Sequence, residues 1–179
     1  MSVTDEARRA TVLEAYPRLR RFFASKVPPA EVQDLAQATI VVFLEKDLSE
    51  VRSPAQFLFG IARNKLLQHF HRRLGTGFDS QRMSLRRLST TLGTKLTRRE
   101  VIVQAMADLA LDQQMALELR YGEDLKLAEV AEAMDKSLAQ TKRYIKDGLD
   151  ALRTQLGRGD DEDARAQLVR QLGLEYRGQ

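Results

Sequence analysis

The sequence predicts an all-α protein made of two small helical modules, an N-terminal bundle and a C-terminal helix-turn-helix bundle, joined by a flexible basic linker. All four prolines lie before residue 55, so the strongest helix breaker is absent from the rest of the chain. Apolar residues recur at helical spacing on both sides of a Gly- and Ser/Thr-rich basic segment. The 179 residues, 43% of them hydrophobic and 30% charged, have the composition of a globular protein and suffice for two such modules.

Several function classes are excluded by what the sequence lacks. Without cysteine the chain can have no disulfide scaffold, thiol nucleophile or cysteine-ligated metal. His69 and His71 would point to different sides of one helix, so they cannot hold one metal together. We find no catalytic constellation and expect neither an enzyme nor a cofactor. A net charge of +4 permits a polyanionic partner. No apolar run could span a bilayer and no signal pattern begins the chain, so we expect a cytosolic protein without membrane insertion.

The first module, residues 5–73, is expected to hold four helices. The first covers residues 5–15. The second follows Pro17, which suits the first turn of a helix because its missing N–H would be unpaired there. Four residues at helical steps should face the core: Val12, Tyr16, Leu19 and Phe23.

A third helix is expected to begin near Ala30, after two consecutive prolines. The β-branched run at residues 39–43 would also suit a buried strand. We favour a helix because no Pro or Gly occurs between residues 29 and 54. A helical stripe also runs through the segment: Val32, Leu35, Ala36, Thr39 and Phe43.

Polar residues 46–53 predict a loop. Ser53 and Pro54 then predict a cap and a first-turn proline, so a fourth helix should run to about Arg73. Residues 74–99 lose the helical period and are expected to be a linker, with a short helix around residues 82–88. The charged residues of this linker are basic except for Asp79: Arg82, Arg86, Arg87, Lys95, Arg98 and Arg99.

The second module, residues 100–156, carries a helix-turn-helix pattern. One short helix has a single apolar face: Leu127, Val130, Ala131 and Met134. Asp135 and Lys136 make the turn, and Ser137 caps the next helix. That helix is expected to bury a second set: Leu138, Thr141, Ile145 and Leu152.

The opposite face of this second helix is a candidate DNA-reading surface. It carries Gln140, Lys142, Arg143 and Lys146, with Thr141 and Tyr144 beside them. Lys and Arg neutralise phosphate or pair with guanine, and Gln pairs with adenine. An ordinary basic surface on a small helical bundle would show the same pattern.

The tail, residues 157–179, carries an acidic run from Asp160 to Asp163. This run would either shield the basic helix by mimicking nucleic acid or be a solvated, frayed end, and we favour the second interpretation. A short amphipathic stretch follows: Ala164, Leu168 and Leu172.

Two independent parts of the chain resemble bacterial sigma factors of the sigma-70 family. LRYGEDLKLAEVAEAMDKSLAQTKRYIKDGLDALR, residues 119–153, resembles their promoter-reading module. Three segments resemble their core-binding and promoter-opening module: YPRLRRFF from Tyr16, VQDLAQATIVVFLEK from Val32 and SPAQFLFGIARNKLLQHFHRR from Ser53. The IARN of residues 61–64 is the strongest element of a match over roughly residues 10–156. Two modules in this order, joined by a basic linker, resemble the extracytoplasmic-function (ECF) group.

The resemblance implies a non-catalytic subunit that binds core RNA polymerase and selects promoter DNA. The second module would read the −35 element as a duplex, and the first would hold the melted non-template strand of the −10 element. The residues implied to bind polymerase are Glu31, Asp34, Leu35, Gln37 and Val41. Those implied to bind the −10 element are Ser49, Arg52, Arg63, Asn64, Lys65, Gln68, His71, Arg72 and Arg73. Those implied to bind the −35 element are Ser137, Gln140, Thr141, Lys142, Arg143, Tyr144 and Lys146. Of Phe57, Phe59 and Phe70, at least two should lie in the core rather than stack on bases.

The polymerase-binding helix departs from the family pattern. Gln33 and Ala38 stand where acids are usual, so this face is less negative than expected. Phosphorylation of Thr39 by a kinase would restore about two negative charges. The alternative, which we favour, is that Thr39 only fills its place in the helix.

The second module departs from the pattern too. Asp135 occupies a turn position where Gly is common, and Lys136 replaces an apolar residue. Asp147 and Asp150 lie where basic residues are frequent. Gly148 weakens its helix by about 1 kcal/mol relative to Ala. We therefore expect weakened contacts with DNA phosphates.

Two other functions fit the sequence. An autonomous helix-turn-helix regulator, with an N-terminal dimerisation module, would bind duplex DNA alone and would need neither residues 61–64 nor Asp34. An interaction protein that has lost promoter activity is the second. The resemblance also implies a partner that holds the protein inactive, such as an anti-sigma protein, although no residue identifies one.

Overall fold

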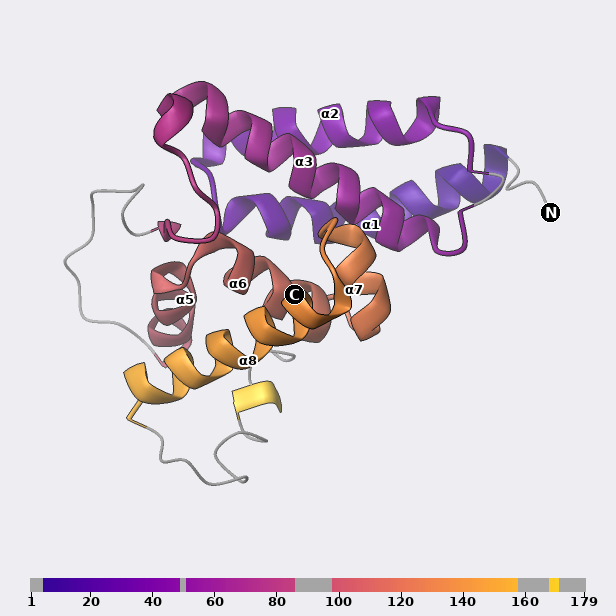
Figure 1. Cartoon of the computed structure of the whole chain (residues 1–179). Coiled ribbons are helices and arrows are strands. Elements are labelled where there is room, and N and C mark those ends of the chain that lie inside the picture. Colours follow the sequence, from indigo (N-terminus) through magenta and orange to yellow (C-terminus); the bar gives the residue numbers. More distant parts are fainter. Residues whose placement is uncertain (1–4, 49–50, 86–97, 158–167, 171–179) are drawn as a thin grey trace.

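The computed structural model of the chain describes residues 5–48, 51–85, 98–157 and 168–170. These ranges are helical apart from turns and one isolated β-bridge between Ser84 and Ala110, and they contain no strand. Figure 1 shows the helices of residues 5–74 above those of residues 98–155, with one layer packed on the other. The predicted all-α fold is confirmed. Among the described helices, none has the length and apolarity needed to cross a membrane.

The first module begins with one continuous helix, α1 (Asp5–Ala24), where two helices were expected. The prediction of a helix start at Pro17 is wrong, because Pro17 lies inside α1. An interior proline costs about 3 kcal/mol through its lost hydrogen bond and its clash with the preceding turn. Residues on both sides of it enter the same core, which offsets this cost: Ala15, Leu19, Phe22 and Phe23 are all buried. Of the predicted core face, Leu19 and Phe23 are buried, and Val12 and Tyr16 pack at its edge.

The next two helices agree with the sequence. In α2 (Pro29–Glu45), residues 39–43 are helical and the predicted stripe is the buried face: Val32, Leu35, Ala36, Thr39 and Phe43. Ser53 caps α3 (Pro54–Leu74), with its Oγ accepting a hydrogen bond from the Gln56 backbone N–H at 3.4 Å. Phe59 and Phe70 are buried and Phe57 packs against the core, as expected for core residues.

The first part of the predicted linker is anchored to both modules. After the short 3-10 helix η1 (Gly75–Gly77), Phe78 is buried with its ring stacked 5.4 Å from that of Phe70. The Ser80 and Met83 carbonyls then accept backbone hydrogen bonds from Asp112 at 3.0 Å and Leu111 at 2.9 Å. Residues 86–97, with most of the predicted helix around residues 82–88, lie outside the described residues.

The second module holds α5 (Arg98–Asp108), α6 (Leu111–Leu117), the π-helical turn η2 (Glu118–Gly122), α7 (Leu127–Ala133) and α8 (Leu138–Gln155). The predicted helix-turn-helix is formed by α7 and α8. Asp135 in its turn has φ +50°, which is the left-handed conformation that explains why Gly is common at this place. The C-terminal acidic run lies outside the described residues, whereas Leu168 is buried.

Gly148 has a packing role that the helical period could not show. A Cβ at this position would lie 3.0 Å from Cδ1 of the buried Leu117. The glycine therefore allows α8 to approach α6 closely, and its cost in helix propensity is repaid by this packing.

The two modules dock on each other, with α3 packed on α7. Gly60 of α3 lies against the end of α7, where an added Cβ would lie 3.4 Å from the Ala133 carbonyl oxygen. One cluster of buried apolar residues continues through both modules. We call the residues that meet here the inter-module contact: Arg18, Lys26, Gln56, Gly60 and Arg63 from the first module, and Asp112, Glu118, Glu123, Glu132 and Ala133 from the second.

Candidate nucleic-acid interface

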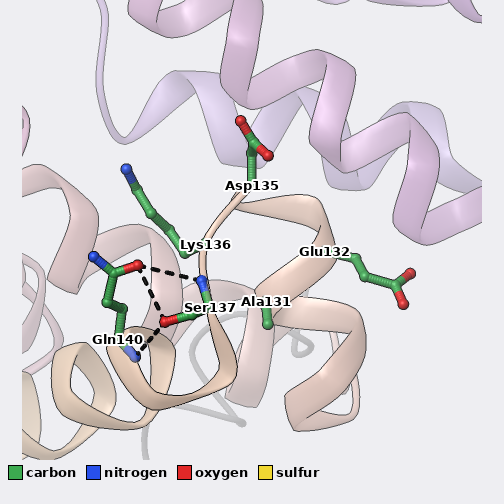
Figure 2. A pocket seen from close by; sticks show the side chains of 6 residues that line it. All are labelled: Ala131, Glu132, Asp135, Lys136, Ser137 and Gln140. Atoms are coloured by element: carbon green, nitrogen blue, oxygen red, sulfur yellow. Dashed lines mark hydrogen bonds between the residues drawn. The ribbon is translucent and has the colours of Figure 1, made fainter.

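The N-terminus of α8 is held by a capping box. The Ser137 Oγ accepts a hydrogen bond from the Gln140 backbone N–H at 3.2 Å, and the Gln140 Oε1 accepts one from the Ser137 backbone N–H at 3.3 Å. Figure 2 shows both side chains turned back onto the turn, beside a hollow that Glu132, Asp135 and Lys136 also line. Gln140 would have to leave this box before it could pair with a base.

Three predicted −35 residues, Lys142, Arg143 and Lys146, are exposed along α8. Thr141 and Tyr144 are instead buried, and the Thr141 Oγ1 donates a hydrogen bond to the Ser137 carbonyl at 3.0 Å. Leu138, expected on the buried face, is 46% exposed, so that prediction is wrong. Leu138 is the first residue of α8. The exposed surface of α8 therefore carries these three cations and Asp147, with the apolar Leu138 at its N-terminal end.

The predicted −10 residues are divided between solvent and the protein interior. Those exposed on α3 or just before it are Arg52, Asn64, Gln68, His71, Arg72 and Arg73, and Lys65 is half-buried. Ser49 lies outside the described residues. Arg73 Nη1 lies 3.2 Å from Glu31 Oε1, so this predicted −10 residue pairs with a predicted polymerase contact.

Arg63 is the exception among these residues, because it is buried in the inter-module contact. Its Nη2 lies 3.7 Å from Oδ1 of the fully buried Asp112 in α6. Four buried polar atoms here have no hydrogen-bond partner within the described residues. They are both carboxylate oxygens of Asp112, the Arg63 Nε and the Tyr144 hydroxyl. In this docked arrangement Arg63 faces a carboxylate and cannot reach a nucleic acid.

The exposed side of α2 is a stripe opposite its buried one. Asp34, Gln37 and Val41 lie on it, and Val41 is 54% exposed. Leu35 is buried and belongs to the core instead. Leu44 continues the stripe at 42% exposure, although it is not among the residues predicted to bind polymerase. The stripe thus offers one acid, one amide and two apolar side chains to a partner.

Thr39 is fully buried, and its Oγ1 donates a hydrogen bond to the Leu35 carbonyl at 2.8 Å. This position favours the interpretation that Thr39 fills its place in the helix, because a kinase could reach the hydroxyl only after α2 had detached.

His69 joins α3 to α2. Its Nε2 lies 3.0 Å from Glu31 Oε2. Burial lowers the pKa of His69, while the neighbouring Glu31 carboxylate acts in the opposite direction. His71 lies on the other side of α3 with its ring 4.9 Å from that of Phe78. The two histidines point apart, as the spacing indicated.

Sequence reasoning missed the charged residues that hold the modules together. Lys26 and Glu118 form a buried ion pair, and Arg18 pairs with Glu123. The Gln56 amide donates to the Glu132 carboxylate at 2.5 Å. No local pattern marks these residues, since each pair is separated by more than seventy positions and forms only when the modules dock.

The comparisons with known proteins agree with this geometry. Residues 105–154, which include both helices of the helix-turn-helix, match the family model of sigma-70, region 4. The second module is therefore similar to region 4 of the sigma-70 family. The predicted resemblance to sigma factors is thereby confirmed, and this family is in general not enzymatic.

The fold of this chain is similar to that of the sigma factor RpoE from Bartonella quintana in its co-crystal structure with the anti-sigma factor NepR. The two are 20% identical, the alignment covers 83% of this chain and 96% of that chain, and the TM-score is 0.64. At this identity the likeness concerns the fold, and it extends over both modules. No curated protein sequence matches the chain.

Proposed function

We propose that this chain is a sigma factor, which binds core RNA polymerase through the exposed stripe of α2 and directs it to promoters. In this proposal α8 reads the −35 element as a duplex, and the basic side of α3 holds the melted strand of the −10 element. The single observation that carries the proposal is the family match over α7 and α8. The three cations that α8 exposes support it.

The charge of α8 supports phosphate and base contacts. Lys142, Arg143 and Lys146 are spaced so that all three can reach one groove of DNA, and arginine can pair with the O6 and N7 atoms of guanine. Asp147, directly after Lys146, is also exposed, so the net positive charge of this surface is smaller than three cations alone would give. This supports a role in which DNA affinity comes partly from the polymerase that the factor is bound to.

The first module supports the other half of the proposal. The α2 stripe combines Asp34 and Gln37 with exposed apolar Val41 and Leu44, which is the composition of a protein-binding surface. The basic end of α3 is suited to the backbone of a single strand. Since core polymerase and promoters are in the bacterial cytoplasm, the proposal places this chain there as well. An anti-sigma protein is a proposed further partner, by analogy with the RpoE complex.

In vitro transcription tests the proposal. Purified chain and core bacterial RNA polymerase are incubated with a genomic fragment library, and start sites are mapped with and without the chain. We expect new start sites that share two elements. Arg143→Ala should reduce their use and relax the preference at one −35 base pair, at a cost of about 1–3 kcal/mol. Arg20→Ala, which removes an exposed arginine of α1 far along the chain from α8, is the control.

The same experiment separates the autonomous regulator from the sigma factor. A regulator would bind a duplex fragment without polymerase, and Asp34→Ala would not affect it. For a sigma factor, Asp34→Ala should weaken co-elution with core polymerase and leave the fold unchanged, because Asp34 is exposed. If the chain never co-elutes with core polymerase, the proposed function is wrong.

A further inference from the structure

We propose that Asp147 of α8 determines base specificity, because its carboxylate accepts a hydrogen bond from the N4 amino group of a cytosine in the −35 element. The sequence alone gives this acid only a negative role, that of weakening the contacts with DNA phosphates. The inference rests on the proposed function, since it concerns how α8 would read the −35 element.

Asp147 lies on the exposed side of α8. The residues that α8 buries lie on the opposite side: Thr141, Tyr144, Ile145, Gly148, Leu149 and Leu152. Arg143 is exposed as well, and residues four apart on a helix are neighbours on one face. The helical rise separates Arg143 from Asp147 by about 6 Å along the axis, which is less than two base-pair steps of about 3.4 Å each. A helix that places Arg143 in a groove of DNA therefore brings Asp147 to the bases beside it.

Asp147 and Asp150, the two acids of α8, differ in what holds them. Asp150 forms an ion pair with Arg153 of the same helix. For the Asp147 side chain, the described part of the chain provides neither an ion pair nor a hydrogen bond, and Arg143 one turn away is no exception. The Asp147 carboxylate is therefore available to a donor from outside the protein.

A carboxylate in the major groove can accept a hydrogen bond from few groups. The phosphates repel it, and guanine O6 and N7 and thymine O4 are themselves acceptors. The donors are the amino groups of cytosine and adenine. Adenine carries the acceptor N7 beside its amino group, whereas cytosine presents its amino group alone, so a carboxylate favours cytosine. Asp147 should therefore select cytosine both by attraction and by repulsion of guanine and thymine.

The cations around Asp147 allow such an acid to approach DNA. Lys142 and Lys146 are exposed and can neutralise phosphates, and Arg143 can pair with guanine. In this arrangement the lysines supply affinity, while Arg143 and Asp147 read bases. The alternative is that Asp147 only repels phosphates, which would lower the affinity for every sequence alike. The two interpretations differ in whether the effect of Asp147 depends on the base.

Transcription from a promoter library tests the inference. The templates carry the strongest promoter found with the genomic fragments, with its −35 element randomised, and holoenzyme is formed from core polymerase and the full chain. For the unaltered chain we expect cytosine at one position, preferred about tenfold. Asp147→Ala should lose the preference at that position and keep the others. Asp147→Asn should shift it toward adenine, because an amide can accept from N6 and donate to N7.

Asp150→Asn is the matched control. It removes the same charge from the same helix, at a residue that already has a partner in Arg153. It should raise the use of all templates by a similar factor and leave every base preference unchanged. Circular dichroism should be the same for all three variants, since neither Asp147 nor Asp150 is buried.

A base analogue tests the single hydrogen bond. In 2-pyrimidinone the N4 amino group of cytosine is replaced by hydrogen. Placed at the selected position, the analogue should lower transcription by the unaltered chain about tenfold more than transcription by Asp147→Ala. The weaker pairing of the analogue with guanine affects both chains equally, so the difference between them isolates the contact with Asp147.

The inference is overturned if Asp147→Ala changes the use of all templates alike, because the acid then only repels phosphates. It is also overturned if the analogue affects the unaltered chain and Asp147→Ala equally. Both results leave the proposed function standing, since promoters are still selected. An unaltered chain that selects no start site with core polymerase refutes the proposed function, and this inference falls with it.

Discussion

The interior of each module and the contact between the modules are built from different chemistry. Inside the first module, α1, α2 and α3 meet through fully buried apolar side chains such as Phe23, Phe43 and Phe59. The contact between the modules also has an apolar part, but charged pairs and a glycine determine where the surfaces meet. An apolar interior is stable over a wide range of conditions, whereas a charged contact depends on what else can bind the charges. The first is suited to permanent structure and the second to a change of partner.

The largest effect is expected inside a module. Phe43→Ala removes a fully buried ring from between α2 and α3, and substitutions of this kind cost about 3–5 kcal/mol. Urea unfolding followed by circular dichroism measures the loss. Phe43→Leu, which keeps most of the volume, should lose much less. If the two variants were equally stable, the α2–α3 interior would not be tightly packed.

A smaller effect, of a different kind, is expected at the contact. Glu118→Gln leaves Lys26 buried beside a neutral amide, which inside a rigid core would cost about 3–5 kcal/mol. Here the modules can separate and hydrate Lys26, so we expect a loss of about 2 kcal/mol at most and two unfolding transitions in place of one. The double variant Lys26→Met/Glu118→Leu should recover most of the loss. A single transition with the full loss would show that the contact is as permanent as the interiors.

Two glycines allow the same comparison to be made with one added methyl group. At Gly148, inside the second module, a Cβ would lie 3.0 Å from Leu117 Cδ1, so overpacking should exceed the gain of about 1 kcal/mol in helix propensity. At Gly60, in the contact, the nearest atom would be 3.4 Å away, which is an ordinary contact distance. We therefore expect Gly148→Ala to destabilise the protein by about 1 kcal/mol and Gly60→Ala to be neutral or stabilising. Thermal unfolding of the two variants side by side decides the sign of each.

The sequence predicted each module better than it predicted their relation. The periods of α2 and α8 and the caps at Ser53 and Ser137 are local features, so they could be read from neighbouring residues. Pro17 shows where local reasoning fails, because packing on both sides of it outweighs the propensity of one residue.

The prediction of the site residues failed for a second reason, and Arg63 is the clearest example. Its type and helix position match those of a strand-binding residue, but its present partner, Asp112, comes from another module. Tyr144 is a related case, because its side chain is buried although Arg143 beside it on α8 is exposed. Helical period gives the face on which a residue lies, and it carries no information about what covers that face.

The smallest effect is expected from the pH dependence of stability at the contact between α2 and α3. We call this contact the α2–α3 seam, and it contains His69, which is largely buried. Burial lowers the pKa of His69 below its ordinary value in the folded state. A lowered histidine pKa contributes stability that is present above the unfolded pKa of about 6.5 and is lost as the pH falls through the folded pKa. The free energy of unfolding should therefore decrease from pH 7 toward pH 5, by less than about 1.4 kcal/mol per pH unit for one group.

His69→Gln should reduce this slope in urea titrations. It should leave the distance between the two modules unchanged, because His69 contacts Glu31 within the first module. If the substitution instead altered the distance between the modules, the seam and the contact would not be independent, and the division between permanent interior and exchangeable contact would fail.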